Sequence, residues 1–205
     1  MKGLILACRY SWNCHTAIHF GISERLFDFI TGKKKDPEKI KKLLKILSSY
    51  KSYCNIATAN RIDDPFDIRV ISYYWKGTGY ELDTKIWHNY TTLSPLFNMP
   101  MEIINSNMVD EDFVHPAEII RTDGEKTIIK YYPVIKHKKG LALLEKRKEK
   151  NVANPFTEKY QPGDKIAMHF ESIVEILDEN EFKILSVITR ESLKRFNEKH
   201  KRGRK

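Results

Sequence analysis

The stretch AEIIRTDGEKTIIKYYPVI, residues 117–135, decides the fold class because its apolar pattern differs from that of the flanking sequence. Two runs rich in β-branched residues flank Asp123-Gly124, the dipeptide that best fits a tight hairpin turn. A third strand is predicted over residues 141–146. These features predict a small antiparallel sheet, an insertion over about residues 115–150 that packs on helices.

Apolar side chains recur at helical spacing on both sides of this sheet. The strongest stripe follows the start signal Asp36-Pro37 and consists of Ile40, Leu43, Leu44 and Leu47. Beyond the sheet, residues 166–177 and a segment beginning at Asp178 both read as helices. The fold class we predict is mainly α, of α+β type. A helical domain carries a small β-hairpin insertion and a C-terminal helical pair.

Length and composition indicate one globular domain. The chain has 205 residues, of which 41% are hydrophobic and 31% charged, a balance typical of folded proteins. We expect a domain over residues 1–198 and a basic tail over residues 199–205. No apolar run approaches the roughly 20 residues that span a bilayer, so a cytoplasmic protein without membrane contact is expected. Three cysteines, an odd set, favour reduced thiols.

The formal net charge of +9 is concentrated in two segments. Residues 136–150 hold seven Lys or Arg and two Glu, and residues 199–205 hold five Lys or Arg and no acid. Such patches bind phosphates or acidic partners, although charge runs are more often solvated surface. The candidate residues for a nucleic-acid or acidic partner are Lys136, Lys138, Lys139, Lys146, Arg147, Lys148, Lys201, Arg202 and Arg204.

A first candidate metal group lies near the N-terminus. Cys14, His15 and His19 fall within six residues, and in a helix the two histidines would lie one turn apart, where they could share a divalent ion. The spacing matches no recognised zinc pattern. The alternative is a buried cysteine with histidines that form local hydrogen bonds, and the metal signal here is the weaker one.

A second group consists of His88 and Asn89, with Asp83 shortly before them and His169 far downstream. A histidine near an aspartate can be oriented as a general base or as a metal ligand. No nucleophile motif and no Gly-rich phosphate loop accompanies these residues. Histidines buried for structural reasons are the alternative. If chemistry occurs here, His88 and His169 are the predicted metal ligands, and the metal would be divalent.

Several short motifs together resemble an uncharacterised family of bacterial and archaeal proteins that are often encoded near [NiFe]-hydrogenase genes. The matching motifs are Cys8-Arg9-Tyr10, Gly21, residues 59–67, Val70, Tyr74-Trp75, His88-Asn89 and residues 167–170 leading into Asp178. The family has Cys-Gly where this chain has Phe20-Gly21, which argues against a shared cysteine ligand. The resemblance implies a fold and a genomic neighbourhood, and it supplies no reaction.

Three functional hypotheses follow. The first is a non-catalytic accessory or maturation factor for a metalloenzyme, with [NiFe]-hydrogenase as the example that the resemblance suggests. Its predicted pocket consists of Arg9, Tyr10, Asn60, Asp67, Trp75, Asp83, His88, Asn89 and His169. The second is an RNA- or ribosome-associated protein that binds through the basic segments. The third is an enzyme that uses His88 or His169 as a base.

Overall fold

The computed structural model describes residues 1–78, 86–123, 126–137, 140–156 and 158–202. The chain divides into two compact units, Met1–Trp87 and His88–Lys205. The expected single domain over residues 1–198 stays a prediction. Among the described helices, none is both long and apolar enough to cross a membrane.

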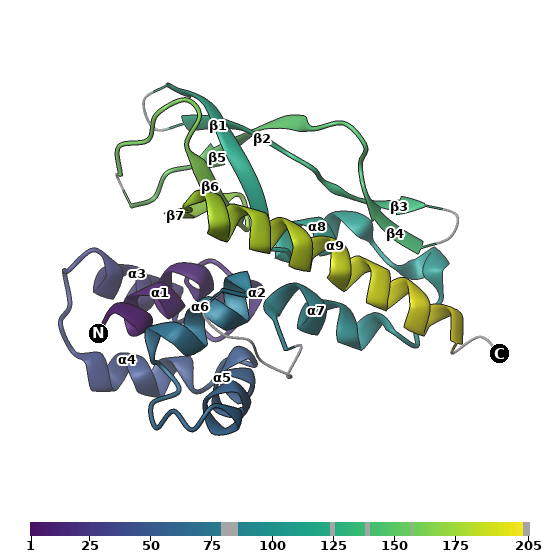
Figure 1. The fold of residues 1–205 in the computed structure, drawn as a ribbon. Helices are drawn as coiled ribbons and strands as arrows, with labels where there is room; N and C mark the ends of the chain where they lie inside the picture. Colours follow the sequence, from purple (N-terminus) through teal and green to yellow (C-terminus); the bar gives the residue numbers. More distant parts are fainter. Residues whose placement is uncertain (79–85, 124–125, 138–139, 157, 203–205) are drawn as a thin grey trace. The chain divides into compact units, whose positions relative to one another are not determined.

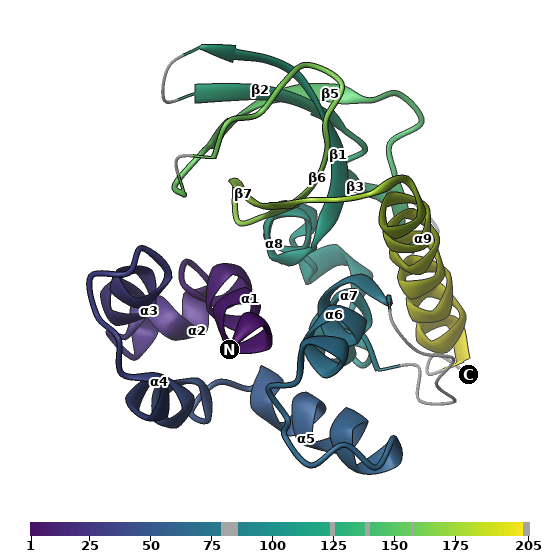
Figure 2. The ribbon, with the colours of Figure 1, turned by 60° about the vertical axis from the view of Figure 1, so that its left-hand side comes forward.

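The regular elements of the first unit are all helices within its described residues (Figures 1 and 2). Its elements are α1 (Lys2–Ser11), α2 (His15–His19), α3 (Ser23–Ile30), α4 (Pro37–Leu44), α5 (Ser49–Ala59) and α6 (Ile68–Lys76). Helix α1 packs on α3 and α6. A Cβ atom at Gly3 would lie 2.1 Å from the carbonyl oxygen of Phe66, so only glycine permits this close approach.

The helix starts in this unit follow side-chain capping. Asp36 accepts a hydrogen bond from the Lys39 amide at 3.0 Å, and Pro37 occupies the first turn, as predicted. Helix α4 ends at Leu44, before the last residue of the predicted stripe, Leu47, and a separate helix, α5, begins at Ser49. Asp67 caps α6 by accepting from the Arg69 amide at 2.9 Å.

The second unit combines helices with strands. Its helical elements are α7 (His88–Leu93), the 3-10 turns η1 (Ser94–Leu96) and η2 (Met101–Ile103), α8 (Ser106–Asp112) and α9 (Glu179–Arg202). Its strands are β1 (His115–Asp123), β2 (Lys126–Tyr131), β3 (Val134–His137), β4 (Gly140–Leu143), β5 (Lys148–Ala153), β6 (Lys165–His169) and β7 (Ser172–Ile176).

Five of these strands form a closed barrel in the order β1-β2-β5-β7-β6, and β3 and β4 pair separately. Neighbouring barrel strands are antiparallel except β5 and β7, which join through the parallel pair Ala153 and Ser172. The prediction of a mainly α protein with a small hairpin insertion is therefore wrong. Apolar side chains fill the barrel: Ala117, Ile119, Ile129, Tyr131, Val152, Tyr160, Ile166, Met168 and Ile173.

The predicted hairpin is confirmed in its strands. β1 pairs antiparallel with β2, and Asp123 lies opposite Lys126. Gly124 of the predicted turn lies outside the described residues. The second predicted run, after Asp123-Gly124, is divided into β2 and β3 at Pro133, which has no amide hydrogen to offer a strand neighbour.

The predicted helix over residues 166–177 is wrong, because this segment forms the hairpin of β6 and β7. Its apolar residues fit a helical stripe, but short apolar runs do not distinguish a helix from a strand that is buried on both faces. The turn also lacks glycine and asparagine, the residues that signal a two-residue hairpin. Phe170 and Glu171 instead adopt φ values of 45° and 59°. The described residues 165–202 therefore form a hairpin and one helix, α9, instead of the predicted helical pair.

Replacing Glu171 with glycine is expected to stabilise the second unit by about 0.5–1 kcal/mol. A left-handed conformation costs a non-glycine residue roughly 1–2 kcal/mol, and glycine avoids this cost. Glycine also loses more conformational entropy on folding, which cancels part of the gain. The lost ion pair to Lys150 is exposed and contributes little. Urea unfolding checks this, and Phe170→Gly is the contrast because it removes the ring that packs on His169.

Helix α9 begins as predicted at Asp178. The Asp178 carboxylate accepts from the Glu181 amide at 2.8 Å, and the Glu181 carboxylate accepts from the Asp178 amide at 3.2 Å, which forms a capping box. The helix lies along β1, β4, β6 and α7 (Figure 1). It continues to Arg202, so the expected tail begins as helix. Its Leu193 and Phe196 join a second apolar core with α7, α8, β3 and β4.

Candidate metal centre

Three side chains from distant parts of the second unit meet at one point. His88 is the first residue of α7, Asp112 is the last residue of α8, and His169 is the last residue of β6. Each residue lies at one end of its element, and the three side chains bring α7, α8 and the barrel into contact. His169 immediately precedes the Phe170–Glu171 turn with its positive φ values, a backbone strain that is often found beside functional residues.

The Asp112 carboxylate lies beside both imidazoles. Its Oδ1 atom is 4.0 Å from His88 Nε2 and 3.9 Å from His169 Nε2. The two rings meet edge to face, with centroids 5.0 Å apart. His88 Nε2 also lies 2.8 Å from the Asp112 carbonyl oxygen. His169 is fully buried, whereas the side chain of Asp112 is 35% exposed, so solvent reaches the group from the carboxylate side.

Burial and the neighbouring charges set the protonation of this group. Burial lowers the pKa of His88 to about 4, and His169 adds to this effect while Asp112 opposes it. Burial alone would raise the pKa of Asp112. The His169 ring beside the carboxylate and the field of both imidazoles outweigh burial, so that the pKa of Asp112 lies below its ordinary value. Near neutral pH His88 is therefore neutral and Asp112 ionised, the states that bind metals.

The metal-free protein is expected to lose about 2 kcal/mol of its free energy of unfolding between pH 7 and pH 4.5 through His88 alone. In this window the unfolded chain protonates the imidazole, with a pKa of about 6.5, while the folded chain does not until about pH 4. Protons therefore favour the unfolded state. Urea unfolding in the presence of a chelator checks this, and His88→Gln should flatten the decline.

The group suits a transition metal by its donor chemistry. Two imidazoles and one carboxylate, with their donor atoms all within 4.8 Å of one another, match sites for zinc, nickel or ferrous iron. Bonds of about 2.1 Å would set tetrahedral donors roughly 3.4 Å apart. Binding therefore requires the donors to close by about half an ångström or more. It also requires His88 to release the Asp112 carbonyl oxygen.

Asn89, predicted as a pocket residue, holds the backbone next to this group. Its Oδ1 accepts from the Val114 amide at 2.8 Å, and its Nδ2 donates to the Val114 carbonyl oxygen at 2.9 Å. Nδ2 also lies 3.1 Å from Thr189 Oγ1 on α9. The side chain is 1% exposed, so it is a buried clamp that positions the start of α7 and therefore His88.

Five other predicted pocket residues lie in the first unit. Tyr10 stacks on Trp75 with a centroid distance of 4.7 Å, and Trp75 donates to the Tyr53 hydroxyl at 2.8 Å, all within the core. Asn60 donates to the Ile56 carbonyl oxygen, and Asp67 caps α6 and pairs with Arg69. Arg9 is half-buried in α1. Asp83 lies outside the described residues.

The weaker N-terminal metal group occupies a capped helix. Cys14 caps α2 by accepting from the Ala17 amide, and His15 and His19 are exposed. Among the described residues, the three side chains that lie close enough to share a metal ion are His88, Asp112 and His169. Cys14, His15 and His19 do not form such a group. Burial raises the pKa of the Cys8 thiol far above its ordinary value, and no disulfide joins the three cysteines.

The predicted basic residues are partly engaged with neighbours. Lys136 donates to the carbonyl oxygens of Glu102 and Ile104, and Arg147 donates to the Glu118 carboxylate at 2.6 Å. Lys146, Lys148 and Lys201 are exposed. Lys138, Lys139 and Arg204 lie outside the described residues, and Arg202 ends α9.

A second buried polar network lies close by, and the sequence analysis missed it. The Asp110 carboxylate accepts from the Tyr131 hydroxyl at 2.9 Å and from the Val134 amide. His115 Nε2 lies 2.8 Å from the Asp110 carbonyl oxygen and 3.1 Å from the carboxylate. Burial opposes the ionisation of Asp110, but these donors outweigh it and lower its pKa. Both Asp110 and Asp112 belong to an acidic run that reads as solvated surface, so the sequence gives no signal for either role.

Residues 96–203 match the sequence model of a family of unknown function, DUF6390. This match covers more than half of the chain. The protein belongs to the DUF6390 family. The matched segment includes Asp112 and His169 and begins after His88. No curated protein and no solved structure matches the chain, so the family assignment brings no reaction, ligand or partner with it.

Proposed function

We propose that this DUF6390 protein binds one divalent transition-metal ion through His88, Asp112 and His169. The observation that carries the proposal is the convergence of two imidazoles and a carboxylate from three separate elements. Asn89 and the strained turn after His169 hold two of these residues in place. The mixed nitrogen and oxygen donors favour zinc, nickel or ferrous iron over magnesium or calcium.

The biological role we propose for such a site is that of a non-catalytic accessory or maturation factor for a metalloenzyme. The resemblance to proteins encoded near hydrogenase genes suggests [NiFe]-hydrogenase as the partner. The partial exposure of Asp112 supports a role in holding and releasing an ion, because a three-ligand site that solvent reaches on one side leaves coordination positions open. The hypothesis of an enzyme with a histidine base depends on the same residues. Tight metal binding at neutral pH would favour the metal-binding role over the enzyme.

Metal analysis of purified protein tests the proposal. After loading with zinc, nickel or iron(II) and desalting, the protein is expected to retain one ion per chain. His88→Ala, His169→Ala and Asp112→Asn should each weaken the binding by about tenfold or more. His15→Ala/His19→Ala is the matched control and should keep the ion. The proposal would be wrong if the protein retained no more metal than the buffer blank. It would also be wrong if metal were lost only in the His15→Ala/His19→Ala variant.

RNA binding is the second candidate. Its support is the exposed cationic segment of Lys146, Arg147 and Lys148 beside the half-buried ring of Tyr132. Tyr131 is 5% exposed and bonded to Asp110, so it offers no stacking surface. Binding of a short RNA that weakens steeply with salt, and further when Lys146 and Lys148 become glutamate, would support this alternative.

A further inference from the structure

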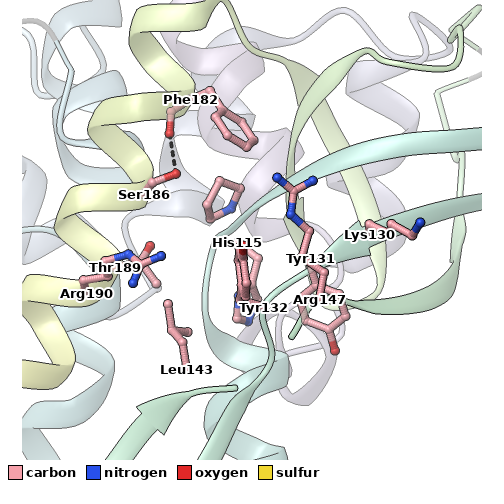
Figure 3. A pocket seen from close by; sticks show the side chains of 11 residues that line it. His115, Lys130, Tyr131, Tyr132, Leu143, Arg147, Phe182, Ser186, Thr189 and Arg190 are labelled. Atoms are coloured by element: carbon pink, nitrogen blue, oxygen red, sulfur yellow. Dashed lines mark hydrogen bonds between the residues drawn. The ribbon is translucent and has the colours of Figure 1, made fainter. Parts of the chain in front are cut away.

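A separate cavity opens between α9 and the strands of the second unit (Figure 3). Phe182, Ser186 and Arg190 of α9 line one side, and Lys130 and Arg147 lie on the other side. The remaining walls are largely apolar and come from Pro116, Leu143 and the tyrosine rings. A mostly apolar cavity with a few fixed polar groups is typical of a small-ligand site.

Two guanidinium groups are held at this cavity by one aromatic ring. The Cζ atom of Arg147 lies 5.5 Å from the centroid of the Tyr132 ring, and that of Arg190 lies 5.8 Å from it. Each contact is a cation–π interaction. The Tyr132 ring therefore brings two cationic side chains to this cavity.

Among the residues that the structure describes, carboxylates pair with two of the three Lys and Arg side chains that line the cavity. Arg147 pairs with Glu118, and Lys130 lies 3.5 Å from Glu149. Arg190 makes no ion pair with any residue of the described ranges. No carboxylate occurs among the described residues that line the cavity. The electrostatics therefore favour an anionic ligand.

The floor of the cavity is rigid. His115 and Tyr131 line it, and the buried Asp110 carboxylate contacts both of them. Because Nε2 of His115 faces Asp110, the ring orientation is fixed. A preorganised floor lowers the entropic cost of ligand binding.

The cavity has a volume of about 50 Å³. A water-sized group needs roughly 10–15 Å³ by the same measure, so about four such groups fit. This number corresponds to the oxygens of a phosphate or to the atoms of a carboxylate with its attached carbon. We propose that the cavity binds the oxyanion group of a small phosphorylated or carboxylated molecule through Arg147 and Arg190. This site is independent of the metal centre.

Titration with inorganic phosphate and with acetate, observed through the NMR signals of the arginine Nε–H groups, tests the proposal. Saturable shifts at Arg147 and Arg190 with at least one of the two anions are expected, and sodium chloride of equal ionic strength should not reproduce them. The anion that saturates distinguishes a phosphate from a carboxylate ligand. Arg190→Gln should weaken the binding about tenfold or more, as for the loss of a charge-assisted hydrogen bond.

Two further variants distinguish anion binding in the cavity from nonspecific binding to the positively charged surface. Ser186→Met fills the cavity without changing any charge and should abolish saturation. Arg195→Gln is the matched control, because Arg195 also lies on α9 against a tyrosine, Tyr90, but does not line the cavity. Equal losses in Arg190→Gln and Arg195→Gln, unchanged binding in Ser186→Met, or shifts that only follow ionic strength would overturn the proposal. Binding of a short RNA without binding of either small anion would do the same.

Discussion

Asp110→Ala is expected to lower the free energy of unfolding of the second unit by about 4 kcal/mol. The substitution leaves two donors without their acceptor, namely the Tyr131 hydroxyl and the Val134 amide. It also removes the charge beside His115 Nε2, which keeps the Asp110 carbonyl oxygen at 2.8 Å. All three residues are at most 5% exposed, so water does not replace the carboxylate. Each buried donor left without a partner costs about 1–3 kcal/mol.

Urea unfolding with Glu149→Ala as the control measures this effect. Glu149 pairs with Lys130 on the surface, and its removal should change stability by about 0.5 kcal/mol or less. The loss of stability in Asp110→Asn should fall between the two. The amide oxygen still accepts a hydrogen bond, but the amide nitrogen replaces the second acceptor with a donor. A loss for Asp110→Ala no larger than that for Glu149→Ala would show that the network does not hold α8 to the strands.

Asn89→Ala is expected to cost about 3 kcal/mol. The Asn89 side chain satisfies both the amide and the carbonyl of Val114 in a fully buried position, and alanine leaves both groups unbonded. Because Asn89 follows His88 directly, the same variant should also weaken metal binding at pH 7, although Asn89 offers no ligand atom to the metal centre.

The protein contains its own matched control for this prediction. Asn197 accepts from the Leu141 amide at 2.9 Å and donates to the Leu141 carbonyl oxygen at 2.8 Å, which repeats the Asn89 arrangement at β4. Asn197 is only half-buried, so water can take over its bonds. Asn197→Ala should therefore cost about 1 kcal/mol and leave metal binding unchanged. Equal costs for the two variants would contradict the role of burial.

Local signals predicted the elements of this fold better than their assembly. Asp36-Pro37, Asp178 and the apolar runs around Asp123 carry their structural reason in a few neighbouring residues, and the structure confirms them. Closure of the barrel depends on β5, whose Lys148–Ala153 segment buries one apolar side chain, Val152. No pattern in such a segment indicates a barrel strand, because its partners are chosen by tertiary pairing.

The candidate site was predictable only in part. His88 and His169 stood out as rare, titratable residues, and the structure places them together. Asp112 did not stand out because exposed carboxylates are common, and its role arises only where α8 ends beside both rings. Tyr10 and Trp75 were predicted as pocket residues because they belong to motifs of the family resemblance, but they form aromatic packing in the first unit.

X-ray absorption on protein loaded with one equivalent of zinc or nickel tests the central claim most directly. A first shell of nitrogen and oxygen at about 2.0–2.2 Å is predicted, with the scattering signature of two imidazoles that falls to one in His169→Ala. A sulfur shell at about 2.3 Å, or imidazole scattering that is unchanged in His169→Ala, would contradict the assignment of the metal to His88, Asp112 and His169.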